Sequence, residues 1–92
     1  MHRVYFDENE QVGAGYALWL PTSKADLALI GPELCEGLRV VIYWTGESEM
    51  EAVLTFDSEE DTWVAIGDHS TYDDSQGAAS YAAWLAAQAQ KP

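Results

Sequence analysis

The sequence predicts a single, mainly β domain, in the form of a small antiparallel barrel of about five strands followed by a C-terminal helix. Two apolar-polar alternating runs and a third short run, separated by short polar loops, occupy the middle third of the chain and favour a β fold. The alanine-rich composition of the last residues predicts the helix. With 92 residues, 48% of them hydrophobic, the chain has material for one core and not for two.

The middle of the chain predicts an antiparallel meander of three strands, over residues 38–44, 50–56 and 62–66. Alternate side chains of a strand lie on the same face. The side chains expected on the buried face are Leu38, Val40, Ile42 and Trp44 in the first strand and Met50, Ala52, Leu54 and Phe56 in the second. Val41 and Tyr43 are then expected to face outward beside Arg39.

Two further strands are predicted before the meander, over residues 2–6 and 14–20. In the first, Val4 and Phe6 alternate with the other side chains. In the second, Gly13 lies just before the strand and Gly15 within it, and these two glycines are expected to weaken the strand or to permit a bulge. Pro21 is expected to end it.

A short helix is predicted over residues 24–30. Ser23 and Asp26 have the spacing of a capping box, and Gly31 followed by proline is a typical stop. Leu27 and Ile30 would then face inward. A short strand over the same residues remains the alternative, because seven residues are too few for periodicity to decide.

The C-terminal helix is predicted over residues 76–89. Asp73, Asp74 and Ser75 precede it, and these residue types are favoured at a helix N-terminus. No charged residue occurs from Ser75 to Gln90, so the helix is expected to dock on the barrel or against another chain. A homodimer through this helix is therefore one expectation.

The run from Gly37 to Ile66 contains a glycine before a strand, a hairpin, an acidic turn and a tryptophan-bearing strand. This arrangement resembles the small SH3-like barrels. The resemblance implies a fold alone, since the aromatic loops with which peptide-binding SH3 domains take proline motifs are missing. The alternative is an α+β fold with a three- or four-stranded antiparallel sheet packed on the helix.

The charge balance is strongly acidic, with sixteen Asp and Glu against four Lys and Arg and a net charge of −12. Ten acids and no Lys or Arg lie between Arg39 and Lys91. Direct binding to nucleic acid is not expected, because its phosphates are held by basic side chains. The same field attracts basic protein surfaces, although acidity that serves only solubility is the alternative.

Acidic residues cluster at one end and on one face of the central hairpin, with seven acids between residues 47 and 61. We expect this surface to dock a basic partner protein, as a small inhibitor or immunity-type protein would. The alternative functions are a structural, self-associating domain without catalytic function and a DNA-mimicking inhibitor. The acids could also serve only to protect a sheet edge from pairing with other chains. The residues predicted to contact the partner are Glu47, Glu49, Glu51, Glu59, Glu60, Asp61 and Tyr43.

No catalytic residue, cofactor or metal site is predicted. Cys35 with His2 or His69 lacks the electropositive setting of a reactive thiol, and the oxygen-rich residues 68–74 match no calcium-loop spacing and suit a turn and helix cap. One cysteine forms no internal disulfide, the N-terminus lacks the apolar segment of a signal peptide, and no apolar run is long enough for a bilayer. A soluble, cytoplasmic protein without a membrane partner is therefore expected.

Overall fold

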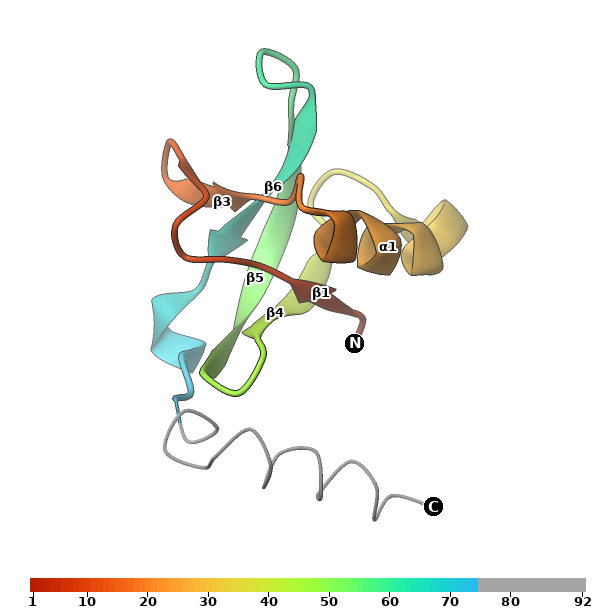
Figure 1. The fold of residues 1–92 in the computed structure, drawn as a ribbon. Helices are drawn as coiled ribbons and strands as arrows, with labels where there is room; N and C mark the ends of the chain where they lie inside the picture. Colours follow the sequence, from red (N-terminus) through yellow and green to blue (C-terminus); the bar gives the residue numbers. More distant parts are fainter. Residues whose placement is uncertain (75–92) are drawn as a thin grey trace.

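The computed structural model describes residues 1–74, and the helix predicted over 76–89 lies outside them. The described chain forms a six-stranded mixed sheet and one α-helix (Figure 1). The strands lie in the order β1-β4-β5-β6-β3-β2. Their bounds are β1 Arg3–Tyr5, β2 Gln11–Val12, β3 Gly15–Ala17, β4 Arg39–Trp44, β5 Ser48–Asp57 and β6 Thr62–Gly67.

The predicted meander is confirmed, because β4, β5 and β6 are consecutive antiparallel neighbours. Ile42 pairs with Met50 and Leu54 with Ala65, so the apolar positions of the three strands share one face. All four side chains are buried in the core. Phe56, expected on this face as a buried residue, is 44% exposed because it lies near the end of β5, where the hairpin extends past the core.

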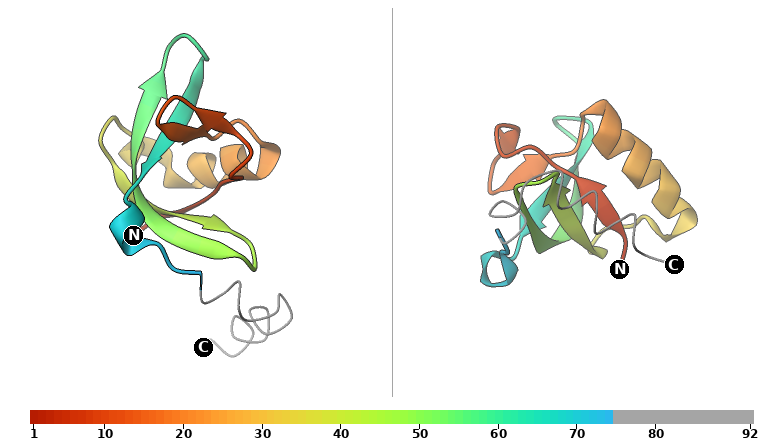
Figure 2. Two further views of the ribbon diagram at one scale, coloured as in Figure 1. Left: turned by 90° about the vertical axis from the view of Figure 1, so that its left-hand side faces the viewer. Right: turned by 60° about the horizontal axis from the view of Figure 1, so that its bottom comes forward.

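The prediction of a closed SH3-like barrel is wrong, although the mainly β class is confirmed. The sheet is open, with β1 and β2 at its two edges (Figure 2). A barrel requires its edge strands to pair with each other. Here β1 pairs instead with β4, and in parallel, with Val4 opposite Ile42. A parallel pair needs a crossover between its strands, and the crossover from β1 to β4 contains β2, β3 and the helix.

The strand predicted over 2–6 is confirmed as β1, whereas the strand predicted over 14–20 is shorter and belongs to a hairpin of β2 and β3. Val12 pairs with Gly15 across a two-residue turn. Gly13 has φ +57° and Ala14 has a negative φ, the pattern of a type II′ turn. Gly15 contacts β6 so closely that a Cβ there would lie 2.6 Å from the carbonyl oxygen of Ala65. The glycines therefore build a turn and a close strand contact, and no bulge is needed.

The helix α1 spans Pro21–Ile30 and begins three residues before the predicted start at residue 24. Pro21 does not end a strand: it starts the helix, where its missing N–H costs no hydrogen bond. Leu27 and Ile30 are buried as predicted. Gly31 is the C-cap of α1 and the first residue of the 3₁₀ turn Gly31–Glu33. Within residues 1–74, no helix combines the length and apolar character that crossing a bilayer requires.

The capping box predicted for Ser23 and Asp26 is wrong, because both side chains bond the outer edge of β1 instead. The hydroxyl of Ser23 donates to the carbonyl oxygen of Tyr5 at 2.6 Å. The N–H of Tyr5 donates to Oδ2 of Asp26 at 2.9 Å. Unpaired strand edges invite pairing with other chains. Helix α1 therefore covers this edge of the sheet with hydrogen bonds as well as with apolar contacts.

Candidate functional site

The residues predicted to bind a partner fall into two groups at opposite ends of β5 (Figure 1). At its start, where the β4–β5 turn lies, the structure places Tyr43, Glu47, Glu49 and Glu51. At its end, in the turn that leads to β6, it places Glu59, Glu60 and Asp61. The strand is ten residues long, so the two groups do not form one continuous surface.

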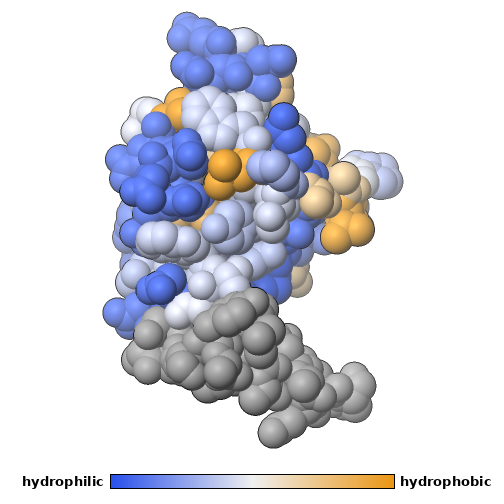
Figure 3. Space-filling model, in the orientation of Figure 1, coloured by the Kyte–Doolittle hydropathy of each residue, from blue (hydrophilic) through white to orange (hydrophobic). Residues whose placement is uncertain are grey.

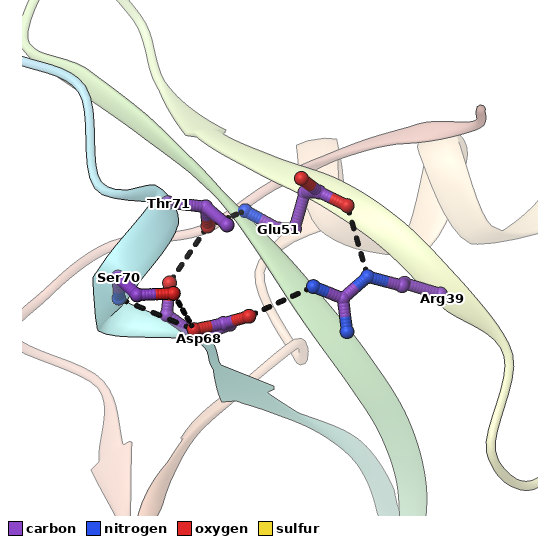
Figure 4. A network of polar contacts seen from close by, with 5 residues as sticks. All are labelled: Arg39, Glu51, Asp68, Ser70 and Thr71. Carbon is purple, nitrogen blue, oxygen red and sulfur yellow. Dashed lines mark hydrogen bonds and ion pairs between the residues drawn. The ribbon is translucent and has the colours of Figure 1, made fainter.

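Most acids of the first group bond arginines of the same chain. Nε of Arg39 lies 2.9 Å from Oε1 of Glu51, and its terminal nitrogen lies 2.8 Å from Oδ2 of Asp68 (Figure 4). These hydrogen bonds, that of Glu51 first, raise the pKa of Arg39 above its usual value. The guanidinium therefore joins β4, β5 and the segment after β6, and an incoming cation would have to compete with it.

The segment after β6 is held along β5 by the same network. Oδ1 of Asp68 accepts from the N–H and the hydroxyl of Ser70, and with Arg39 these bonds lower the pKa of Asp68. Thr71 accepts from the N–H of Glu51 and donates to the carbonyl oxygen of Asp68 (Figure 4). Asp68 thus caps the 3₁₀ turn η2 (His69–Thr71). The turn predicted here is confirmed, whereas the helix that these residues were expected to cap lies outside the described residues. Within residues 1–74, no cluster of His, Cys, Asp or Glu could hold a metal ion.

Tyr43 is partly buried on the outward face of β4, where it pairs with Glu49 of β5. Its hydroxyl donates to Oδ2 of Asp26 at 2.8 Å, and the guanidinium of Arg3 lies 5.1 Å from its ring centre while bonding Glu49 at 3.2 Å. Burial first, and then the bond to Asp26, raise the pKa of Tyr43 to about 12. Helix α1 and β1 therefore already contact much of the side chain that was predicted to meet a partner.

The second group occupies the turn that joins β5 to β6. Oδ1 of Asp57 accepts from the N–H groups of Glu59 and Glu60, at 2.9 and 3.1 Å, and these bonds fix the turn. Asp61 has φ +52°, a left-handed conformation that Asp tolerates better than most residues. Glu59, Glu60 and Asp61 are all exposed. Among residues 1–74, no Lys, Arg or His forms an ion pair with these three carboxylates.

Glu36 holds β5 where β4 no longer pairs with it. Its carboxylate accepts from the N–H of Phe56 at 2.9 Å and from the hydroxyl of Thr55. These bonds, that of Thr55 first, lower the pKa of Glu36. On the other side of the hairpin, the ring of Trp63 packs edge-on against that of Phe56 with centres 5.5 Å apart. Glu36 thereby ties the projecting hairpin to the segment before β4, and the ring contact joins the two strands of the hairpin to each other.

A groove, which the sequence did not indicate, lies between this hairpin and the β2–β3 turn. Its volume is about 470 Å³. Val12 and Ala14, from the β2–β3 hairpin, line one side of the groove, and Asp57 and Glu59, from the β5–β6 hairpin, line the other. Val64 and Ile66 of β6 lie between these two sides. The only sequence signal for it is the type II′ turn signature of Gly13 followed by Ala14, which predicts that a hairpin lies here.

The face seen in Figure 3 is mostly hydrophilic, with small apolar patches, and the turn at the top of the view is covered by hydrophilic residues. Cys35 is exposed, and His2, one of the two histidines considered as its base, lies 2.8 Å from Oε2 of Glu33. No protein-family model, curated protein or solved structure shows a significant match to this chain.

Proposed function

We propose that this chain is a small, acidic, non-enzymatic protein-binding module that docks a basic surface of another protein, as an inhibitor or immunity-type protein does. One observation carries the proposal: the β5–β6 turn projects from the sheet and presents three exposed carboxylates, of Glu59, Glu60 and Asp61, that have no cation partner within residues 1–74. Such carboxylates attract Lys and Arg of a partner without first breaking an internal ion pair.

The division of the acids along β5 supports placing the contact at this turn. Glu49 and Glu51 already bond Arg3 and Arg39, so pairing them with a partner gains less than pairing the carboxylates of the turn. The net charge of −12 adds a long-range field that steers basic proteins toward the molecule. The hydrogen bonds of Asp57 hold the turn before binding, which reduces the ordering cost of association.

The alternatives receive less support from the same contacts. A DNA mimic requires a continuous row of free carboxylates that imitates successive phosphates, and Arg3 and Arg39 interrupt the row along β5. Self-association through the β1 edge is opposed by the bonds of Ser23 and Asp26 to Tyr5. Self-association through residues 76–89 remains a prediction, because these lie outside the described residues.

Affinity capture with two charge-matched triple variants tests the proposal. The first variant, Glu59→Gln, Glu60→Gln and Asp61→Asn, neutralises the turn, and the Asn at 61 keeps a residue that tolerates φ +52°. The control, Glu8→Gln, Glu33→Gln and Asp74→Asn, changes the net charge equally but lies outside the turn.

At low salt, we expect the wild type and the control to capture the same basic protein and the turn variant to fail to capture it. At high salt, we expect none of the three samples to retain this protein, because salt screens the charges. Equal capture by both variants would show that only the overall charge matters and would contradict the proposal. Failure of wild type to retain any basic protein at low salt would also contradict it.

A further inference from the structure

The groove beside the acidic turn has an apolar interior and an acidic margin. The pairing of Thr55 with Val64 and of Val53 with Ile66 places these four side chains on the outward face of the sheet. The β2–β3 turn rises beside them, because Gly15 contacts the backbone of β6 directly. The groove is therefore built by paired strands and by the two turns that join them.

Apolar surface in this groove is open to solvent. Ile66 is 38% exposed near the end of β6, and Val12 of β2, which lines the same groove, is partly exposed. Asp57 and Glu59 line the same groove, and Glu60 and Asp61 follow directly along the turn. No Lys, Arg or His lines it among the described residues.

Charge and chemistry together select one kind of occupant. An acidic ligand is repelled by the carboxylates and by the net charge of −12. A purely basic segment leaves the side chains of Val12 and Ile66 in water, and a purely apolar segment leaves the carboxylates without partners. A protein segment with one aliphatic side chain between Lys or Arg residues satisfies both parts, as is typical of an apolar interface centre with a polar rim.

We propose that the groove receives one aliphatic side chain of a partner protein, and that Lys or Arg residues next to it bind Asp57, Glu59 and the rest of the acidic turn. The inference rests on the proposed function and adds the sequence class of the segment that is recognised. The apolar contact provides specificity that charge alone does not supply, because charge complementarity mainly increases the rate of encounter.

Three capped pentapeptides test the inference in titrations of the isotope-labelled chain followed by nuclear magnetic resonance. The first has leucine between two pairs of lysines, the second has glycine in place of the leucine, and the third has leucine between two pairs of glutamates. We expect the lysine–leucine peptide to bind about three- to tenfold more tightly than the lysine–glycine peptide, as expected for partial burial of one leucine. Its amide shifts are expected at residues 12–14, 55–59 and 64–66.

Two variants separate the groove from the surface in general. Ile66→Thr keeps a β-branched residue in β6 and removes apolar surface from the groove, so the preference for leucine over glycine is expected to fall to about twofold or less. Leu29→Gln, on the exposed side of α1, removes apolar surface elsewhere and is expected to leave the preference unchanged. Leu29 is 82% exposed and does not line the groove.

The outcomes distinguish this inference from the function on which it rests. Equal binding of the leucine and glycine peptides at the acidic turn overturns the groove and leaves the basic-surface proposal intact. Absence of binding by both lysine peptides, or equally tight binding of the glutamate peptide, overturns both. Unchanged leucine preference in Ile66→Thr, with native spectra, also overturns the groove.

Discussion

Replacing Ser23 with alanine tests whether α1 closes the outer edge of the sheet by hydrogen bonding. Ser23 is fully buried, and its hydroxyl donates to the carbonyl oxygen of Tyr5 at 2.6 Å. Alanine removes the donor without adding volume, so the carbonyl loses its partner at the edge of β1. An unsatisfied buried acceptor costs about 1–3 kcal/mol.

The helical position offsets a part of this cost. Alanine is favoured over serine in a helix interior by about 0.5 kcal/mol. We therefore expect Ser23→Ala to lower the free energy of unfolding by about 0.5–2.5 kcal/mol, which for a domain of this size corresponds to a fall in Tm of about 2–20 °C. Thr22→Ala, at the exposed position next to it, is expected to change stability by less than about 0.5 kcal/mol.

Urea unfolding followed by tryptophan fluorescence measures both variants. Light scattering of the same samples reports whether the uncovered edge of β1 now pairs with a second chain. Unfolding of Ser23→Ala at the same urea concentration as Thr22→Ala, with an unchanged slope, would show that the hydrogen bond contributes nothing and would refute this prediction.

Four further predictions follow from the described contacts. Asp26→Asn removes the charge beside the Tyr43 hydroxyl, so its pKa is expected to fall from about 12, as measured by ultraviolet titration; an unchanged pKa would show that burial alone sets it. In the wild type, the Tyr43 hydroxyl of the unfolded chain loses its proton near pH 10, whereas that of the folded chain loses it at higher pH. The free energy of unfolding is therefore expected to decrease between pH 10 and 12, and a free energy of unfolding that stays constant over this range would contradict the assigned pKa. Gly15→Ala forces a Cβ to within 2.6 Å of the Ala65 carbonyl oxygen and is expected to cost about 1–3 kcal/mol in urea unfolding, with faster amide exchange in β2 and β3; wild-type stability would refute the close contact. Asp61→Gly is expected to be about 1 kcal/mol more stable than Asp61→Ala, because the residue has φ +52°, and equal melting temperatures would argue against that backbone conformation.

Local patterns were sufficient to predict the central meander. A two-residue period over residues 38–44 and 50–56 determines which side chains of β4 and β5 are buried, and a one-residue shift would expose every one of them. The inward positions Leu27 and Ile30 of α1 followed from helical spacing in the same way. In each of these elements the period of the apolar residues within one segment coincides with the face that is buried.

Long-range pairing was not contained in these patterns. The parallel contact of β1 with β4 joins segments nearly forty residues apart, and the alternation in residues 2–6 is compatible with either direction or any neighbour. From the sequence, Pro21 was predicted to end a strand and Ser23 to cap a helix. In the structure Pro21 starts α1 and Ser23 bonds Tyr5, and the bond to Tyr5 depends on β1 lying beside the helix. Here tertiary contacts overrode a local signal.

The contacts of the predicted site residues were not contained in local patterns either. The acids that cluster in the sequence lie at the two ends of β5, and the sequence does not show that Arg3 and Arg39 reach Glu49 and Glu51 across neighbouring strands. The groove needs two hairpins to meet, so no single run of residues indicates it. The carboxylates left for a partner are consequently those of the turn at residues 59–61.

Amide hydrogen exchange of this chain, free and in complex with a basic protein recovered in the affinity capture, tests the proposed binding surface most directly. The account predicts slower exchange in the complex at the acidic turn, residues 57–61, and at the β2–β3 turn, residues 12–14, with α1 unchanged. Protection confined to α1 or to the β4–β5 turn, with both of these segments exchanging as in the free chain, would contradict it.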